Sequence, residues 1–442
     1  MRSAWLRALA VYLDRRVLAI FFLGFASGLP LLLGLSTLSA WLSEEGVSKT
    51  TIGLFSWAGS FYTFKYLWSP LVDRLRLPWL TRKLGRRRGW LLVSQLAVIV
   101  AILGLGSTHP GQDLFATAIW TVVLAFTSAT QDIVIDAYRV EILDESQLGA
   151  GAATVVFGYR VGMLAAGAGT LIVADLAGWH AAYMTMAALM GVGMVTVLLN
   201  PEPPGAAADA LAEEANALAT PAEKAVAWLN GAVIAPFKEF MTRPGWLVIL
   251  LFVIFYKYAD ALLGVMANPF YLEMGFTKTE IAILSKSYGL VMTLVGVFIG
   301  GVLVARAGIL RSLLLAGVLQ GASNLIFAWQ ATMGHSEPAL ALTISVENLC
   351  GGMATAVFVA YLSSLCNVAY TATQYALLSS FSAFARTLFS AGAGWLADHM
   401  SWVSFWIVTT LAALPGLMLL VWMMRRFPST GPPEAEMLPE PE

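Results

Sequence analysis

Charge and cysteine are both scarce in this sequence. Only 12% of the 442 residues are Asp, Glu, Lys or Arg, whereas 58% are hydrophobic and the mean hydropathy is +0.74. A soluble chain carries about 25% charged residues, so the charge present here cannot cover a water-facing surface of this size. The shortage excludes a soluble enzyme, a nucleic-acid-binding protein and a disordered protein, and it predicts a polytopic membrane protein.

Cysteine and histidine are too few and too scattered for a disulfide or a metal site. Cys350 and Cys366 lie sixteen residues apart on one predicted helix, and a helix rises about 1.5 Å per residue, so their sulfurs cannot meet. The histidines fall in predicted loops: His109, His180, His335 and His399. Because no catalytic cluster lies within an apolar segment, a membrane-embedded enzyme or a receptor is less favoured than a transporter.

Twelve apolar segments are long enough to cross a membrane, which takes roughly 20 residues. They cover residues 17–40, 51–71, 90–108, 114–138, 150–175, 180–199, 245–271, 279–305, 311–333, 338–362, 374–397 and 402–424. Their scattered small residues are typical of closely packed membrane helices, and their continuous apolar character excludes a β-barrel. The first segment is flanked by Arg15 and Arg16 and has no clear cleavage site, so we expect a membrane helix there.

Basic residues divide unevenly between the two sides of the membrane. With the N-terminus placed in the cytoplasm, the inside segments hold nineteen of the 26 Lys and Arg residues, whereas the outside loops hold only Lys49 and Lys278. This bias predicts that both termini are cytoplasmic. The predicted organisation is an N-terminal six-helix bundle (1–199), a cytoplasmic linker (200–244), a C-terminal six-helix bundle (245–425) and a cytoplasmic tail (426–442).

The two halves resemble each other in sequence. GVSKTTIG (46–53) follows the first span and GFTKTEIA (275–282) follows the seventh, while Arg160 and Arg386 each precede an AGAG motif in spans 5 and 11. Two matches at corresponding spans indicate duplication. Parallel six-helix repeats joined by a long linker are the plan of the major facilitator superfamily. The predicted fold class is therefore an all-α protein of twelve membrane helices in two six-helix bundles.

The loop 70–89 supports the same resemblance, because it has an Asp followed by a basic cluster, as the inside loop of that superfamily does. We expect Asp73 to brace the inner end of one conformational state through salt bridges. Two halves that rock about a site at the membrane midplane would expose that site to each side in turn.

Nine charged residues lie in the interior of the predicted spans, at least two residues from either end, where charge is costly and usually functional. They are Lys65, Asp132, Asp136, Arg160, Lys257, Asp260, Lys286, Glu347 and Arg386. Spans 3, 6, 9 and 12 have none, as expected if these four helices face lipid. The charges could be helix-to-helix ties, or they could line a hydrated cavity whose slight positive excess suits an anionic or zwitterionic solute.

The positions of these charges along their helices suggest which of them could act together. Asp132 and Asp136 share one helical face, and Lys257 can pair with Asp260. The predicted proton-coupling residues are Asp132, Asp136, Glu347 and Asp260, with Asp132 as the assigned proton carrier. The predicted substrate-binding residues are Lys65, Gln131, Arg160, Tyr256, Lys257, Asn268, Asn348, Gln374, Tyr375 and Arg386.

Several longer motifs resemble the AmpG muropeptide permeases. They include LGFASGLPLLL (23–33), FKYLWSPLVDR (64–74), RRRGWLL (86–92), SATQDIVIDAY (128–138), GAGAA (149–153), GYRVGML (158–164), YKYADALLGVMANPFY (256–271), ENLCGGMATAVFVAYLSSLCN (347–367) and ATQYALLSSFSAFAR (372–386). The resemblance covers about residues 17–425, at matching span positions. Within it, Gln131 and Asp132 match the functional motif of the fourth span.

This resemblance implies an importer in the bacterial inner membrane. Its substrate would be N-acetylglucosaminyl-anhydro-N-acetylmuramic acid and the corresponding peptides, taken up at the expense of the proton gradient for peptidoglycan recycling. In many bacteria this cargo also controls beta-lactamase induction. The expected partners are the muropeptide and the lipid bilayer, with the proton as the coupling ion, no other cofactor, no nucleic acid and a monomeric state. The alternative is a proton-dependent permease of the same group for a drug, a siderophore or an acyl-CoA-like anion.

Overall fold

The computed structural model describes residues 10–204, 230, 234–390 and 392–426, and this part of the chain is helical with short connections and contains no strand. The first half consists of η1 (Val11–Leu13), α2 (Arg15–Gly34), α3 (Ser36–Glu44), α4 (Lys49–Phe55), η2 (Ser56–Gly59), α5 (Ser60–Phe64), η3 (Lys65–Leu67), α6 (Ser69–Arg74), α7 (Leu80–Leu84), α8 (Arg86–Gly106), α9 (Leu114–Ile142), η4 (Glu145–Gln147), α10 (Leu148–Leu164), η5 (Ala165–Gly169), α11 (Thr170–Leu189) and α12 (Gly191–Leu199).

The second half consists of α15 (Ala235–Thr242), α16 (Trp246–Tyr256), α17 (Tyr258–Glu273), α18 (Lys278–Ile281), η7 (Ala282–Tyr288), α19 (Gly289–Ala307), α20 (Ile309–Met333), α21 (Glu337–Ser364), η8 (Val368–Tyr370), α22 (Thr371–Ser390), α23 (Ala393–His399), α24 (Trp402–Leu411) and α25 (Leu414–Arg426). Most of the predicted linker and nearly all of the predicted tail lie outside the described residues.

Nine helical stretches within the described part are long and apolar enough to cross a membrane. One of them, Glu145–Leu199, contains two predicted spans, because Gly178 adopts φ 84° and ψ 163° and breaks the helix between them. The predicted span 51–71 is built from the short pieces α4 to α6, and the span 374–397 from α22 and α23. All twelve predicted spans are therefore helical, and the expected all-α fold is confirmed.

Glycine allows two helices of the first bundle to pack unusually closely. On α2, a Cβ added at Gly28 would lie 2.1 Å from the carbonyl oxygen of Tyr159 on α10. On α10, a Cβ at Gly158 would lie 2.0 Å from the carbonyl oxygen of Phe21. Because no side chain fits at either point, α2 and α10 bring their backbones together, as small residues allow in membrane helices.

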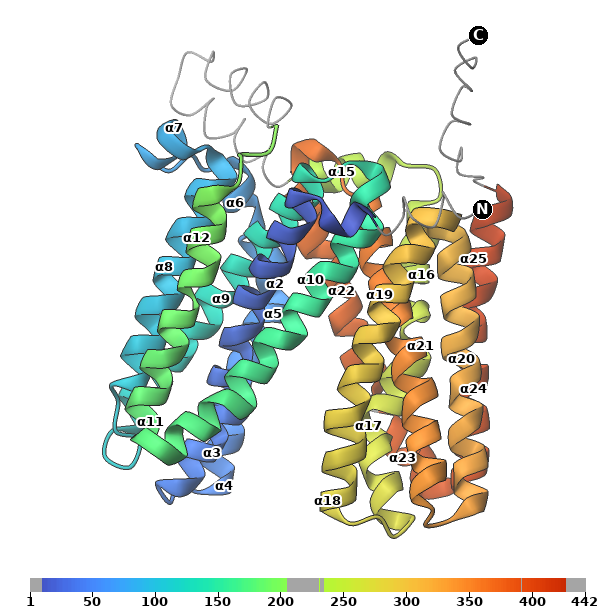
Figure 1. Ribbon diagram of the computed structural model, residues 1–442. Coiled ribbons are helices and arrows are strands. Elements are labelled where there is room, and N and C mark those ends of the chain that lie inside the picture. The colour runs from blue at the N-terminus through green and yellow to red at the C-terminus, as the bar shows by residue number, and fades with distance from the viewer. Residues whose placement is uncertain (1–9, 205–229, 231–233, 391, 427–442) are drawn as a thin grey trace.

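The two six-helix bundles lie side by side (Figure 1). Their helices approach each other near the end where α6 and α15 lie, and they diverge toward the end where α4 and α18 lie (Figure 1). Between the bundles, α10 packs against α19 and α21, and α22 packs against α5, α6 and α9. We call the end with α6 and α15 the inner end, since the basic residues predict that it faces the cytoplasm.

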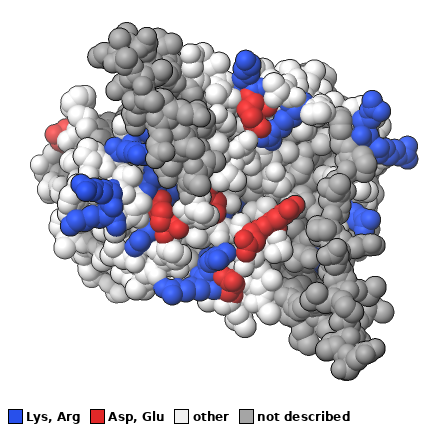
Figure 2. All heavy atoms as spheres, turned by 90° about the horizontal axis from the view of Figure 1, so that it is seen from above, with Lys and Arg blue, Asp and Glu red and all other residues white. Residues whose placement is uncertain are grey.

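Basic side chains gather on the face seen when the inner end is viewed end-on, with acidic side chains between them (Figure 2). Trp79 in the loop before α7 is exposed there, and the ammonium of Lys83 lies 4.4 Å from the centre of its ring. The spans predicted to face lipid expose apolar side chains on their outer faces, for example Leu96 of α8 and Val318 of α20.

Candidate functional site

A cavity of about 630 Å³ lies between the bundles and is lined mainly by the second half of the chain. Val156 and Arg160 of α10 form the wall contributed by the first half. Helices α17, α19, α20, α21 and α22 supply the rest. Six of the predicted site residues line it together: Arg160, Lys257, Asp260, Glu347, Asn348 and Arg386. A volume of roughly 300 to 1,000 Å³ is usual for a small-molecule site.

Lys257 and Asp260 form an ion pair in the cavity wall. The ammonium of Lys257 lies 2.7 Å from the Asp260 carboxylate and 3.4 Å from the hydroxyl of Thr355. Lys257 is the residue between α16 and α17, with φ −99° and ψ 9°. The helix break at this residue places the two charges one turn apart and facing each other, as their spacing predicts.

Glu347 and Asn348 provide a second polar cluster on α21. The Asn348 amide donates to the Glu347 carboxylate over 2.6 Å and to the carbonyl of Ile344 over 3.0 Å. The Thr293 hydroxyl of α19 donates to the Asn348 side-chain oxygen over 2.8 Å. These bonds fix the orientation of the Asn348 amide, so that the Glu347 carboxylate is held at the cavity wall.

Arg160 and Arg386 line the cavity from opposite halves of the chain. Neither guanidinium forms a hydrogen bond or ion pair with another described residue, and Arg386 is exposed to the cavity. A guanidinium can hold a carboxylate through two parallel hydrogen bonds. The repeated arginines therefore offer two cationic sites to an anionic solute.

A separate charged network lies in the first bundle. The Ser27 hydroxyl of α2 donates to the Asp132 carboxylate over 2.5 Å. Asp136, one turn further along α9, pairs with Lys65 at 3.6 Å and with Arg139 at 3.2 Å. Lys65 and Asp136 are thus helix-to-helix ties in this state, whereas Asp132 accepts a hydrogen bond from a neutral hydroxyl.

Gln131, beside Asp132, is fully buried, and neither its side-chain oxygen nor its nitrogen has a hydrogen-bond partner in the part of the chain described. Tyr256 lies outside the cavity lining, since its hydroxyl donates to the carbonyl of Leu313 and its ring stacks on Phe358. Asn268 is exposed on α17 and is likewise not part of the cavity lining.

Gln374 and Tyr375 lie in the first turn of α22, at the inner end rather than in the cavity. The Gln374 amide donates to the carbonyl of Pro236 and accepts from the backbone N–H of Asn367. The guanidinium of Arg139 lies 5.0 Å from the centre of the Tyr375 ring. Both residues therefore hold α22 in place in this state. Lys286 falls in η7, and its side chain lies outside the part that the structure describes.

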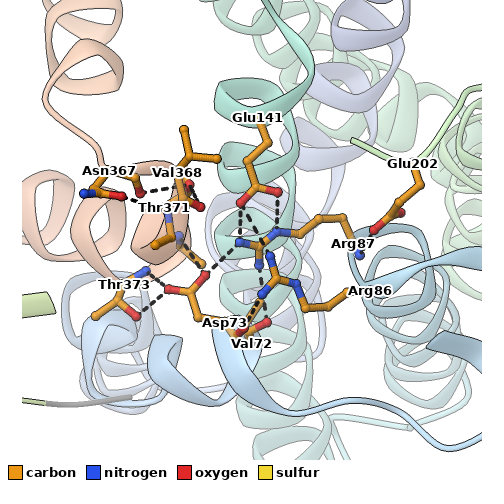
Figure 3. Close-up of polar contacts among 12 residues, drawn as sticks. Val72, Asp73, Arg86, Arg87, Glu141, Glu202, Asn367, Val368, Thr371 and Thr373 are labelled. Atoms are coloured by element: carbon orange, nitrogen blue, oxygen red, sulfur yellow. Dashed lines mark hydrogen bonds and ion pairs between the residues drawn. The ribbon is translucent and has the colours of Figure 1, made fainter. Parts of the chain in front are cut away.

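Asp73 joins the two halves at the inner end, where the sequence predicts salt bridges (Figure 3). The contacts that cross to α22 are hydrogen bonds, and the salt bridge of Asp73, to Arg87, stays within the first half. Its carboxylate accepts from the backbone N–H groups of Ala372 and Thr373 at 3.1 and 2.7 Å, and from the Thr373 hydroxyl at 2.6 Å. Arg87 pairs with the same carboxylate at 2.7 Å and with Glu141 at 2.5 Å. A carboxylate at the N-terminus of a helix is favoured by the helix dipole, so Asp73 stabilises the closed inner end.

Arg139 forms a second tie between the halves, because its guanidinium donates to the hydroxyl of Ser363 on α21 over 2.7 Å. Its other bond, to Asp136, remains within α9. The inner end is therefore closed by two buried cations of the first half, Arg87 and Arg139. Arg87 holds the Asp73 carboxylate that bonds α22, whereas Arg139 itself bonds Ser363 of the second half.

Several members of the cavity and of the inner-end contacts carry little or no signal in the sequence. Glu141 and Thr373 of the inner end carry no spacing signal that separates them from ordinary residues near the end of a span. Gln320 lines the cavity from α20, although α20 is one of the spans predicted to face lipid. The single available signal for Gln320 is that a glutamine interrupts the apolar run LLLAGVLQGA.

Two bundles of membrane helices that enclose a charged cavity and meet at one end form a membrane transporter. The model of the Major Facilitator Superfamily matches residues 17–271 and 256–440 of this chain. The Escherichia coli fucose:proton symporter has a similar structure, with a TM-score of 0.68 at 13% identity, over 92% of this chain and 97% of that one. For the proton:xylose symporter the TM-score is 0.67 at 12% identity, over 95% and 96% of the two chains.

Proteins related to this chain in sequence identify its family within the superfamily. The anhydromuropeptide permease of Escherichia coli strain K12 is 41% identical over 95% of this chain and 82% of its own length. The putative transporter AmpG 4 of Rickettsia felis is 37% identical over 94% of this chain and 98% of its own length. The chain therefore belongs to the AmpG permease family within the Major Facilitator Superfamily. It is a transporter rather than an enzyme, and a multi-pass protein of the bacterial inner membrane.

Proposed function

We propose that this protein imports N-acetylglucosaminyl-anhydro-N-acetylmuramyl peptides into the cytoplasm for peptidoglycan recycling, with the proton as the coupling ion. The observation that carries the proposal is the cavity of about 630 Å³ whose lining includes Arg160 from the first half of the chain and Arg386 from the second. The proposed substrate combines neutral sugars with peptide carboxylates. The guanidinium groups match the carboxylates, and the polar side chains of Asn348, Thr355 and Ser382 match the sugars.

The relatives support the substrate class. The Escherichia coli relative is an anhydromuropeptide permease by name, and the alignment with it covers 95% of this chain. The motif ENLCGGMATAVF contributes Glu347, Asn348, Gly351 and Thr355 to the cavity lining. The residues that carry the family resemblance are thus, in part, the residues that a solute in the cavity would touch.

Proton coupling requires a group that exchanges its proton with each side of the membrane in turn. We assign this role to Asp132, which is partly buried in α9 and accepts a hydrogen bond from Ser27. Asp260 is less suited, because its carboxylate is already paired with the ammonium of Lys257, which lies 2.7 Å away. Asp136 is likewise held between two cations, Lys65 and Arg139.

The test is uptake of radiolabelled anhydromuropeptide into proteoliposomes with and without an imposed pH gradient. The wild-type protein should concentrate the label only with the gradient. Asp132→Asn should lose concentration against a gradient while retaining exchange of labelled for unlabelled solute. Glu337→Gln is the matched control, because Glu337 is exposed in the first turn of α21. Gradient-driven accumulation by Asp132→Asn would exclude Asp132 as the coupling group, and failure of the wild type to take up the muropeptide would exclude the substrate.

A further inference from the structure

The segment that precedes the first span contacts the other half of the protein. It lies near the inner end, where α2 begins (Figure 1). The hydroxyl of Tyr12 in η1 donates to the backbone carbonyl of Phe298 on α19 over 3.1 Å, and the centres of the two rings lie 4.8 Å apart. Because η1 belongs to the first half and α19 to the second, this pair is a tie between the halves that involves neither Asp73 nor Arg139.

The same segment is fixed to the first half. The Asp14 carboxylate accepts from the backbone N–H of Arg16 over 2.8 Å, which caps α2. It also accepts from the side-chain amide of Gln147 over 3.0 Å, just before α10 begins. Helices α2 and α10 both pack against η1. Tyr12 must therefore move with α2 and α10 when the two halves move relative to each other.

The Tyr12 hydroxyl lies at a gap that a glycine leaves on α19. A Cβ added at Gly301 would overlap this hydroxyl. The same Cβ would lie 2.7 Å from the side chain of Ala153 and 3.0 Å from the carbonyl oxygen of Gly149, both on α10. Small residues thus allow α10 and α19 to pack closely, and the hydroxyl occupies space that remains beside their contact.

This contact between α10 and α19 adjoins the cavity. Tyr12 and Val156 pack against the buried side chains of Ala153 and Val297. Val156 and Val297 also line the cavity, whereas Tyr12 does not. Phe298 keeps 41% of its surface exposed, so the Tyr12 bond lies at the edge of the helix contact and not in its core. The inner end cannot open between α10 and α19 unless this bond breaks.

We propose that Tyr12 is a positioning residue of the transport cycle, which holds α10 against α19 while the inner end is closed and releases α19 when that end opens. It acts on a solute only through the two helices that it joins. A contact that exists in one of two states shifts their balance toward that state. Loss of the Tyr12 contact therefore favours the state that is open at the inner end.

The first test measures this balance without any solute, so it does not depend on the identity of the substrate. Distances between spin labels on the inner ends of α6 and α22 give the ratio of open to closed molecules. Tyr12→Phe, which loses only the hydrogen bond, should raise this ratio about threefold, and Tyr12→Ala, which also loses the ring contacts, about tenfold. Leu13→Ala is the matched control, because Leu13 lies in the same η1 and is 79% exposed. Its ratio should equal that of the wild type, and the same ratio in Tyr12→Ala and Leu13→Ala would overturn the proposal.

A reversible crosslink provides the second test. In a background of Cys350→Ser and Cys366→Ser, a cysteine pair at Tyr12 and Phe298 is joined with a short bis-methanethiosulfonate reagent. The joined protein should lose uptake of anhydromuropeptide into proteoliposomes, and a reductant should restore it, whereas the reagent should not block uptake by the protein with Tyr12→Cys alone. Uptake by the joined protein at the rate measured before joining would overturn the proposal. Absence of uptake by the wild type would overturn the proposed function, and the spin-label ratios would still decide the role of Tyr12.

Discussion

The charged side chains of the cavity and of the inner end fall into two groups, those paired with an opposite charge of the protein and those that are not. Lys257 and Asp260 neutralise each other, as do Asp73 and Arg87. Arg160 and Arg386 have no such partner among the described residues, although they line the same cavity. Charges of this kind within a membrane protein usually serve a solute or an ion.

Substitution of Arg160 by Gln should therefore raise KM for uptake of peptide-bearing muropeptide by about tenfold or more, since one charge-assisted contact to a carboxylate is lost. Arg160→Lys keeps the charge but not the forked geometry of the guanidinium, so its KM should lie between those of the wild type and Arg160→Gln. Kinetics of uptake into proteoliposomes provides the measurement. Arg311→Gln, at an exposed position of α20 near the inner end, should behave as the wild type. An unchanged KM in Arg160→Gln would assign Arg160 to helix packing instead.

Sequence reasoning locates charged residues along a span better than it places them around the helix. The in-span charges Arg160, Glu347 and Arg386 line the cavity. Tyr256 does not, because the break at Lys257 turns the end of α16 toward α20. The face that a side chain presents depends on how neighbouring helices pack, and the sequence of one helix does not contain that information. The same limit explains why Gln320 was not predicted.

Among the helices, α8 and α22 offer a matched comparison, because each has a carboxylate at its N-terminus. Asp73 bonds two backbone N–H groups of α22 in the other half of the protein. Glu202 bonds the backbone N–H groups of Arg87 and Arg88 at the start of α8, at 2.7 and 2.9 Å, within its own half. Only the Asp73 contact has to break when the halves separate at the inner end.

Asp73→Asn should consequently favour opening of the inner end by about 1 to 2 kcal/mol, since a charge at a helix N-terminus is lost across the interface. Glu202→Gln should leave that equilibrium unchanged. Distances between spin labels on the inner ends of α6 and α22 measure the two populations. An equal shift in both variants would mean that the Asp73 contact is no more than a local helix cap.

The contact of helix α15 with α22 should weaken at acidic pH. Glu239 lies outside the membrane spans, where burial raises its pKa and the hydrogen bonds from Arg243 and Gln374 lower it, with a net pKa below the ordinary value of 4.5. A carboxylate whose pKa is depressed stabilises the folded state above its unfolded pKa, and that contribution is lost as the pH falls through the depressed pKa. The contact of α15 with α22 should thus persist from neutral pH to about 4.5 and weaken below it.

Hydrogen exchange of the α15 amides, corrected for the intrinsic effect of pH, measures this contact. In Glu239→Gln the protection should be lower at neutral pH and should no longer fall on acidification. Protection that is equal in the wild type and Glu239→Gln at every pH would show that packing of Phe240 and Pro236, both buried, holds α15 without the carboxylate.

The arrangement of the two bundles represents a state closed at the inner end. Every inter-half tie described above through Asp73 or Arg139 lies there, and the bundles diverge toward α4 and α18 (Figure 1). The sequence predicts this architecture well, since α20 begins within two residues of its predicted span and ends with it. It does not predict the division of the second span into α4 to α6 or the π-helical turns η5 and η7, because such local distortions arise from contacts with neighbouring helices.

Alternating access predicts that the inner and outer ends never close together. Arg74 and Tyr370 face each other at the inner end, with 5.5 Å between the guanidinium carbon and the ring centre. Leu54 and Trp395 are exposed near the other end of the same two spans. In a background of Cys350→Ser and Cys366→Ser, a cysteine pair at Arg74 and Tyr370 should crosslink without solute and block uptake. A pair at Leu54 and Trp395 should crosslink only in molecules whose inner pair is open, so both crosslinks in one molecule would contradict the rocking mechanism.

If a muropeptide and a proton move together through this cavity, uptake of the solute must carry protons with it. Proteoliposomes containing the purified protein and a pH-sensitive dye in the lumen receive N-acetylglucosaminyl-anhydro-N-acetylmuramyl peptide outside, with no gradient imposed. The lumen should acidify as the solute is taken up, and it should not acidify on addition of sucrose or in liposomes containing Asp132→Asn. Uptake of the muropeptide with no change of lumenal pH would contradict proton coupling, and the absence of both would contradict the proposed function.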